Sequence, residues 1–339
     1  MRYRSLGRTG IMVSPYALGT LMYATRMGND PDESARIIHR ALDAGINFLD
    51  TADVYGDSEE VVGKALKGRR DNVVLATKFG RPVGEDPNQR GTSRRWIVRA
   101  VENSLRRLRT DYIDVYQVHR LDPATDIEET LSALTDLIRS GKVRAVGSSN
   151  TPASEIVEAQ WVAERRGLER MHTEQPPYSL LNRGVEREVL PVAQRHGLGV
   201  MVWGPLAQGL LTGRVRKNQE NTLTRAGMFT HLSNEHRIDV VERLIPLAEG
   251  AGMPLTHLAM AFTLAHPGVT SALAGARTMA HLDDLIAGFD VRLDDDLLDR
   301  IDEIVPPGVE VGTLDQEYLP PAILDPDLRR RPAADRSAA

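Results

Sequence analysis

The fold is decided by one segment, Asn47-Phe48-Leu49-Asp50-Thr51-Ala52-Asp53-Val54-Tyr55-Gly56-Asp57-Ser58-Glu59-Glu60. It consists of a short apolar run that ends at the carboxylate of Asp50, followed by a loop that carries Tyr55. Two later apolar runs end in the same way, one at Lys78 and one at His119. Each of these ionisable side chains stands where a short buried strand would reach the surface. We therefore expect an aspartate, a tyrosine, a lysine and a histidine to meet at one mouth.

The rest of the chain alternates short β-branched runs with longer segments of helical period, which predicts parallel strands joined by crossover helices. Eight strands are expected, the number that closes a (β/α)8 TIM barrel of the α/β class. The predicted strands cover residues 16–18, 47–49, 73–77, 113–118, 143–147, 171–174, 199–202 and 269–272. The predicted helices cover residues 33–43, 58–66, 93–108, 127–140, 153–166, 184–196, 239–249 and 279–287.

Several polar or aromatic side chains fall just past the carboxyl ends of these predicted strands. In a (β/α)8 barrel, the active site is built at that face. The candidate functional residues are therefore Asp50, Lys78, His119, Ser149, Gln175 and Trp203. A chance scatter of polar residues would not place all of them at one face.

The two ends of the chain are predicted to be additions to the barrel, within one domain that spans residues 1–339. Residues 1–12 are expected to form an N-terminal β-hairpin, and residues 306–339 a C-terminal loop and tail. The glycines of the hairpin, at 7 and 10, are interpreted as turn formers because the Walker spacing that cradles phosphates is absent. The segment 212–237 lacks clean periodicity, as does the C-terminal stretch. Such connections are typical of functional lids or disordered chain.

Bulk composition favours a soluble cytoplasmic enzyme. The 339 residues fit one domain, because α/β barrels commonly hold about 200 to 250 residues or more in one core. The net charge is −5 without a concentrated basic run, so neither nucleic acid nor a membrane is expected as a partner. No cysteine is present, which excludes disulfides and thiolate metal sites and fits a reducing compartment. The nine histidines show no metal-binding spacing, so no metal cofactor is expected.

The motifs together resemble those of the aldo-keto reductase superfamily. The tyrosine follows the aspartate by five positions, and a strand-ending lysine and a strand-ending histidine come next, in the order of the family's catalytic set. The resemblance covers residues 2 to about 285. Segments 80–82 and 174–179 are similar to bacterial branches that include general aldehyde and ketone reductases and sugar-nucleotide 2,3-reductases. The resemblance to the superfamily implies that the hairpin plugs the end of the barrel opposite the active site. It also implies that the catalytic residues are Asp50, Tyr55, Lys78 and His119.

The resemblance implies reduction of a carbonyl to an alcohol, and this reaction explains the residue types. Hydride attack on a carbonyl carbon leaves an oxyanion, which needs a proton or donors already in place. Tyr55 is the expected acid. A phenol with a pKa near ~10 is a poor acid at neutral pH, but a nearby ammonium favours the phenolate. Lys78 would supply that charge, Asp50 would hold the lysine, and His119 would orient the substrate oxygen.

Each group also has a structural alternative when it is taken singly. Asp50 could cap a helix, Lys78 could be a solvated strand end, and His119 could be a buried core histidine. Asn150 could be a simple turn residue, and Trp203 could merely pack in the core.

The resemblance also implies a bound NADPH. Ser149, Asn150 and Gln175 match the residues that hold the nicotinamide carboxamide, and Trp203 matches the ring that stacks on the nicotinamide. A glycine-rich strap at 204–214 would let backbone amides approach the pyrophosphate.

The segment Gly275-Ala276-Arg277-Thr278 resembles the family's adenosine 2′-phosphate site, where a guanidinium can bind phosphate in a bidentate manner. NADPH is therefore expected over NADH. Where the family usually has glutamine, glutamate and asparagine, this chain has His281, Asp284 and Leu285, which leaves room for weaker or less selective cofactor binding. The predicted cofactor residues are Gly19, Thr20, Asp50, Ser149, Asn150, Gln175, Trp203, Gly204, Pro205, Leu206, Gln208, Gly209, Leu211, Arg214, Gly275, Ala276, Arg277, His281 and Asp284.

The substrate is the least determined feature, because the barrel sets the reaction and the loops set the specificity. A small carbonyl compound is expected. One alternative that stays open is a sugar-nucleotide keto-hexose 2,3-reductase. Another is a cofactor-binding regulatory or redox-sensor subunit with slow turnover, like the potassium-channel β subunits that share this fold. The oligomeric state also stays open, and the candidate substrate residues are Tyr23, Trp96, Arg120, Met228 and Phe229.

Overall fold

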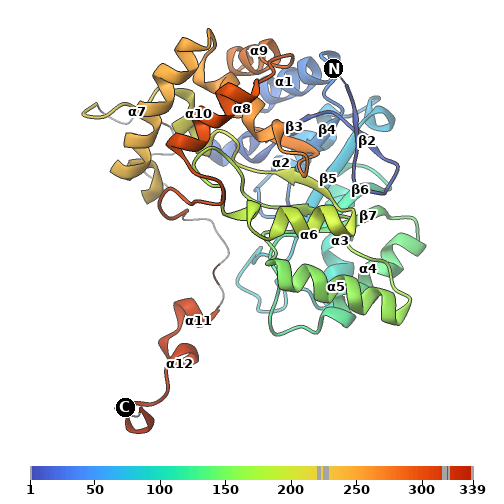
Figure 1. Cartoon of the computed structure of the whole chain (residues 1–339). Coiled ribbons are helices and arrows are strands. Elements are labelled where there is room, and N and C mark those ends of the chain that lie inside the picture. Colours follow the sequence, from blue (N-terminus) through green and yellow to red (C-terminus); the bar gives the residue numbers. More distant parts are fainter. Residues whose placement is uncertain (1, 220–222, 224–228, 315–318, 320, 337–339) are drawn as a thin grey trace.

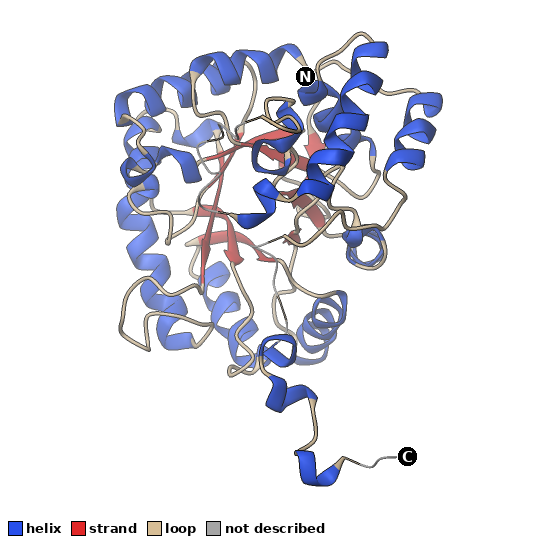
Figure 2. Ribbon diagram, turned by 90° about the vertical axis from the view of Figure 1, so that its left-hand side faces the viewer, coloured by secondary structure: helices blue, strands red, loops and turns tan. Residues whose placement is uncertain are grey.

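The computed structural model describes residues 2–219, 223, 229–314, 319 and 321–336. Its centre is a closed barrel of eight parallel strands in sequential order, so the predicted (β/α)8 TIM barrel is confirmed (Figure 2). The barrel strands are β3 (Tyr16–Gly19), β4 (Phe48–Asp50), β5 (Val74–Phe79), β6 (Ile113–Val118), β7 (Val143–Ser149), β8 (Thr173–Gln175), β9 (Gly199–Val202) and β10 (Ser271–Ala274).

Helices surround the barrel (Figure 1). Their starts follow from local chemistry. Asp30 accepts a hydrogen bond from the amide of Asp32 and precedes Pro31 at the first helical position, and Ser93 accepts one from the amide of Trp96. The longer helices are α1 (Pro31–Asp43), α2 (Ser58–Ala65), α3 (Arg94–Leu108), α4 (Ile127–Arg139), α5 (Ala153–Arg166), α6 (Val189–His196), α7 (Glu235–Gly250), α8 (Leu255–Ala265), α9 (Met279–Ala287) and α10 (Asp295–Ile304).

Several helices differ from the sequence-based expectation. The segment 184–196 divides into the 3-10 turn η4 (Gly184–Glu186) and α6, and α7 begins four residues before the predicted start at 239. The helices α8 and α10 were not predicted. Most residues of α8 are buried, so this helix lacks the polar face that reveals a helix in a sequence.

The N-terminal hairpin closes the amino end of the barrel. Its strands β1 (Arg4–Ser5) and β2 (Met12–Val13) are antiparallel, as predicted for residues 1–12. Leu6 and Val13 are fully buried in one cluster with residues that line the barrel interior. Gly7 has a φ of +58°, and a Cβ there would lie 2.4 Å from the backbone nitrogen of Gly199. Only glycine fits this close approach.

The barrel interior changes from apolar to polar along the strands. Phe48, Ala76, Val115 and Met201 belong to the apolar cluster above the hairpin. Two residues further along β4, β5 and β6 stand Asp50, Lys78 and Gln117. Residues two apart on a strand share one face, so these polar side chains form the next layer, toward the carboxyl end where barrel active sites lie.

The C-terminal region returns to the barrel and then leaves it. Arg237 donates to the carbonyl of Val311 at 2.9 Å, and Arg183 donates to that of Val305 at 2.6 Å. Beyond residue 320, the short helices α11 (Pro321–Leu324) and α12 (Pro326–Arg329) project away from the barrel (Figures 1 and 2). Among the described helices, none is long and apolar enough to cross a membrane.

Candidate active site

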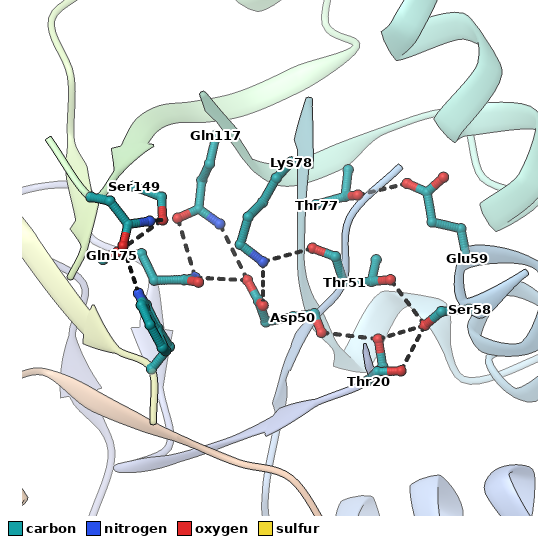
Figure 3. A network of polar contacts seen from close by, with 12 residues as sticks. Thr20, Asp50, Thr51, Ser58, Glu59, Thr77, Lys78, Gln117, Ser149 and Gln175 are labelled. Carbon is teal, nitrogen blue, oxygen red and sulfur yellow. Dashed lines mark hydrogen bonds and ion pairs between the residues drawn. The ribbon is translucent and has the colours of Figure 1, made fainter. Parts of the chain in front are cut away.

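Lys78 and Asp50 form a buried ion pair at the carboxyl ends of β5 and β4 (Figure 3). The lysine Nζ lies 2.5 Å from Asp50 Oδ2 and donates a second bond of 2.9 Å to the carbonyl of Thr51. Both side chains are at most 2% exposed. A buried charge is tolerated when it is paired and hydrogen-bonded, and this pair meets both conditions. The predicted contact between Asp50 and Lys78 is therefore present.

The second oxygen of Asp50 is held by two amides. Gln175 Nε2 donates to Asp50 Oδ1 at 2.8 Å, and Gln117 Nε2 donates to the same oxygen at 3.3 Å (Figure 3). Both glutamines are buried. Asp50 thus accepts bonds from three other strands of the barrel, β5, β6 and β8, which fixes its orientation.

Tyr55 reaches the same place from the loop after β4. The amide of Asp53 donates to the carbonyl of Lys78 at 3.0 Å, and the amide of Tyr55 donates to that of Ala52 at 3.1 Å, which folds the loop back over β5. The Tyr55 ring centroid lies 5.1 Å from Lys78 Nζ and 5.8 Å from the centroid of the His119 ring. The four residues predicted to be catalytic therefore lie together.

The surroundings favour the charged form of Lys78 and the neutral form of His119. Burial alone would lower the pKa of Lys78, but the Asp50 carboxylate and the Tyr55 side chain more than offset it, so the lysine pKa lies above its ordinary value. Burial, followed by the charge of Lys78, lowers the pKa of His119 well below its ordinary value. The site therefore combines an ammonium with a neutral imidazole at neutral pH.

A chain of hydrogen bonds extends from this pair along the barrel mouth. Trp203 Nε1 donates to Asn150 Oδ1 at 3.0 Å, and Asn150 Nδ2 donates to the hydroxyl of Ser149 at 2.6 Å. That hydroxyl donates to the backbone carbonyl of Gln175 at 2.9 Å. The Gln175 side chain then bonds Asp50. The residues predicted to hold a carboxamide are thus contiguous with the predicted catalytic pair.

Basic side chains gather at the amino end of α9. Burial, followed by the charges of Arg214 and Arg277, lowers the pKa of His281, which indicates that both arginines lie near this imidazole. Thr278 caps the helix by accepting from the amide of His281. Apart from its chain neighbours, no described residue would lie within 4 Å of a Cβ at Gly275, so the backbone there is open to close approach. Helix amino ends and arginines both favour anions.

The comparison with known proteins agrees with this arrangement. The model of the Aldo/keto reductase family matches residues 16–306. The chain belongs to the aldo-keto reductase family. It is 42% identical to the uncharacterized oxidoreductase YrpG of Bacillus subtilis (strain 168), over 91% of this chain and 98% of that protein. It is 39% identical to the aldo-keto reductase YhdN of the same organism, over 87% and 91% of the two chains.

A further relative carries a different name. The probable voltage-gated potassium channel subunit beta of Oryza sativa subsp. japonica is 36% identical, over 90% of this chain and 97% of that protein. Members of the aldo-keto reductase family generally use NAD(P)H and reduce carbonyl compounds, so this protein is an oxidoreductase of that general type.

Some residues predicted to touch ligands are instead packing residues in this aldo-keto reductase. Tyr23 and Trp96 are at most 2% exposed in the hydrophobic core, so neither side chain lies open at the mouth. Thr20 is fully buried and donates to the carbonyl of Asp50 at 3.0 Å. The side chains of Leu211 and Ala276 are also core residues, which leaves only their backbone for a ligand.

The positions that depart from the family pattern have local explanations. Leu285 is 4% exposed and packs in the core. The carboxylate of Asp284 lies 3.2 Å from the imidazole of His257, so this acid has a partner within α8.

The remaining predicted residues that the structure describes lie in loops and at strand ends. Ala207, Gln208 and Gly209 all have positive φ, which bends the strap sharply after β9, and Gln208 contacts His231. Phe229 stacks on His231 with ring centroids 5.5 Å apart. Arg120 donates to the carbonyl of His119 at 3.2 Å. Met228 lies outside the described residues. Gly19 is the last residue of β3, and Gly204, Pro205 and Leu206 lie in the loop that follows β9.

Sequence reasoning missed a set of buried polar residues behind the mouth. Gln117 shares a strand face with His119, and this alternation could have revealed it. Glu174 is fully buried; it accepts from the Ser148 hydroxyl at 2.5 Å and from the Thr151 amide at 3.0 Å, and so fixes the turn that carries Asn150. Burial raises the pKa of Glu174 to about 7. No simple sequence signal marks such a residue as buried.

Proposed function

We propose that this protein reduces an aldehyde or ketone to the corresponding alcohol with NADPH, and that Tyr55 is the general acid. The observation that carries the proposal is the buried Lys78–Asp50 pair, whose ammonium lies 5.1 Å from the Tyr55 ring. An ion pair of this kind has little structural benefit over apolar packing, because desolvation offsets the attraction between the charges. A charge kept beside a phenol is better explained by chemistry.

The residues at the mouth fit a nicotinamide cofactor. The amides of Asn150 and Gln175 and the hydroxyl of Ser149 offer the donors and acceptors that a carboxamide needs. Gly204 has a φ of +70° with open space where a Cβ would stand, so a ligand can approach the backbone there. The half-buried ring of Trp203, held by its bond to Asn150, offers a face for stacking.

The proton transfer follows from the charges around Tyr55. When bound, a reduced nicotinamide supplies a hydride to the carbonyl carbon. As negative charge develops on the carbonyl oxygen, Tyr55 Oη gives it a proton, and the ammonium of Lys78 stabilises the phenolate that is left. The neutral imidazole of His119 donates to the same oxygen and orients it. A proton from solvent then restores the phenol, and the alcohol leaves.

The preference for NADPH over NADH is supported by the basic residues at the start of α9. Arg277 can receive a 2′-phosphate, and Arg214 adds a second positive charge near His281. Asp284 and Leu285 stand where the family usually has glutamate and asparagine, and this difference removes polar contacts to the cofactor that the family usually offers. We therefore expect NADPH to be preferred by a smaller margin than a complete set of contacts would give.

A second function is favoured by one comparison. The relative from Oryza sativa is named as a probable potassium channel subunit, so a regulatory role with slow turnover is the alternative. Following NADPH absorbance with a panel of aldehydes, ketones, α-dicarbonyls and nucleotide-linked keto-sugars separates the two. Rapid oxidation with one group would support the reductase and name its substrate class. Tight NADPH binding without turnover on any group would favour the regulatory role.

A further inference from the structure

A hollow of about 460 Å³ lies beside the loop that carries Tyr55. Its walls come from that loop, from α3, from Arg26 and from the loop that joins β5 to α3. None of the four predicted catalytic residues lines it, although Val54 and Gly56 on either side of Tyr55 do. The hollow is therefore distinct from the Lys78–Asp50 centre but shares its most important loop.

Three arginines give the hollow a positive charge. Arg107 is paired with the buried Glu59 at 2.6 Å, so its charge is largely neutralised. Among the described residues, Arg26 donates to one backbone carbonyl, that of Val54, at 2.8 Å. Arg99 has no carboxylate within 4 Å among the described residues, and the amide nitrogen of Asn103 beside it has no hydrogen-bond partner there. Neither Arg26 nor Arg99 therefore has a carboxylate within 4 Å in the described part of the chain. The charge of Arg99 does reach Asp86, where it adds to the hydrogen bonds from Asn88 in lowering the pKa of that carboxyl.

The floor of the hollow adds little negative charge to offset them. Asp53 is 9% exposed, and neither carboxyl oxygen has a hydrogen-bond partner within the described part of the chain. Burial and the neighbouring Glu59 raise the pKa of Asp53 to about 8, against the lowering effects of Arg107 and Lys78. The carboxyl is therefore mostly uncharged at neutral pH. The hydroxyl of Tyr116, which lies near Asp53, is likewise buried without a hydrogen-bond partner in the described part of the chain.

We propose that this hollow binds the carboxylate or phosphate group of a small molecule, through Arg26, Arg99 and Asn103. Guanidinium groups favour such anions, and an uncharged floor does not repel them. The anion can belong to the far end of the carbonyl substrate or to a separate ligand. If the anion is the far end of the substrate, the inference rests on the proposed function, and the substrate class is a carbonyl compound that also carries a carboxylate or phosphate.

The hollow is coupled to the loop of Tyr55 by contacts of Arg26. This side chain holds the carbonyl of Val54, and its Nε would lie 3.3 Å from a Cβ at Gly56. An anion that binds Arg26 therefore acts on both neighbours of Tyr55. Occupancy is expected to change the rate of carbonyl reduction and not only the affinity for the anion.

The first test compares substrates with and without an anionic end. The ratio of kcat/KM for ω-oxo carboxylates to that for alkanals of equal length is measured in the wild type, in Arg99→Gln and in Arg95→Gln. Arg95 is an exposed arginine on the same helix that does not line the hollow, so it controls for general charge. If the anion is the substrate's far end, the ratio falls about tenfold in Arg99→Gln, as for the loss of one charged hydrogen bond. It stays unchanged in Arg95→Gln.

The second test detects a separate ligand by calorimetry with sulfate as the probe, in the presence of NADPH. Sulfate binding that Arg99→Gln weakens about tenfold and Arg95→Gln leaves intact, without a preference for oxo acids, supports a separate ligand. Calorimetry needs no turnover, so this result would stand even if no carbonyl were reduced. Equal effects of the two substitutions, or neither sulfate binding nor an oxo-acid preference, would overturn the proposal.

Discussion

Replacing Asp53 by asparagine should stabilise the protein increasingly as the pH rises. The substitution keeps the shape of the side chain and removes its ability to ionise. In the folded protein, burial and the nearby Glu59 raise the pKa of Asp53 from its ordinary value of 3.8 to about 8. Neither carboxyl oxygen has a hydrogen bond of normal geometry within the described residues, and the nearby amide of Val54 offsets the rise in pKa only in part.

The sign follows from proton linkage. Between pH ~4 and ~8 the folded protein retains a proton at Asp53 that the unfolded chain has released, so wild-type stability falls with rising pH. Each pH unit in this window lowers the free energy of unfolding by about 1.4 kcal/mol. From pH ~5 to ~8 the loss amounts to about 4 kcal/mol, an upper figure because the loop can relax. Asparagine does not titrate, so Asp53→Asn escapes this loss.

Urea denaturation of both proteins at several pH values measures the effect. The difference in the free energy of unfolding should grow through the window and level off above pH ~8. Asp57→Asn on the same loop is the matched control with the opposite sign. Burial alone would raise the pKa of Asp57, but hydrogen bonds from Thr25 lower it, so its carboxylate stabilises the fold at neutral pH. A difference between wild type and Asp53→Asn that stays flat with pH would refute the reasoning.

Three further predictions concern the proposed chemistry. Tyr55→Phe should lower kcat by about 10²- to 10⁴-fold and leave NADPH affinity nearly intact, since the phenol acts on the substrate oxygen; normal turnover would remove Tyr55 as the acid. Arg277→Ala should weaken NADPH about tenfold or more in a fluorescence titration and NADH much less, and equal losses would exclude the 2′-phosphate role. Gln117→Leu should lower kcat about tenfold, because it removes one of the hydrogen bonds that orient Asp50. The control Gln160→Leu removes a buried amide bond to the carbonyl of Met171 and should lower stability alone. Equal kcat values for the two variants would contradict this.

The barrel could be predicted because buried parallel strands appear in a sequence as short apolar runs. The predicted strands 113–118 and 199–202 have the same bounds as β6 and β9. Others shifted by up to two residues, as with β10, where the strand continues toward polar residues at the mouth. Helix α8 escaped prediction because a helix buried on most sides has no polar stripe, and periodicity is the signal on which prediction depends.

The buried polar residues could not be predicted for a related reason. Glu59 and Glu174 are the kinds of residue that usually lie in solvent, so a sequence gives no sign that they are enclosed. Glu59 is fully buried because Thr77 donates to it at 2.6 Å and Arg107 pairs with it. Partners from β5 and α3 become neighbours only when the barrel closes. The quartet was recognisable because Asp50, Lys78 and His119 lie at strand ends and Tyr55 lies in the loop after the first of these strands, whereas their supporting residues lie anywhere that the fold permits.

The bonds among these residues connect the two halves of the proposed site. Trp203, Asn150 and Ser149 would hold the nicotinamide, and Asp50 and Lys78 would assist the acid; Gln175 belongs to both groups, because its backbone carbonyl accepts from Ser149 and its side chain donates to Asp50. The carboxylate that pairs with Lys78 is therefore bonded directly to a residue of β8. Gln117 from β6 holds the same oxygen, so two strands fix its position. These bonds would position the ammonium beside Tyr55 relative to a bound nicotinamide.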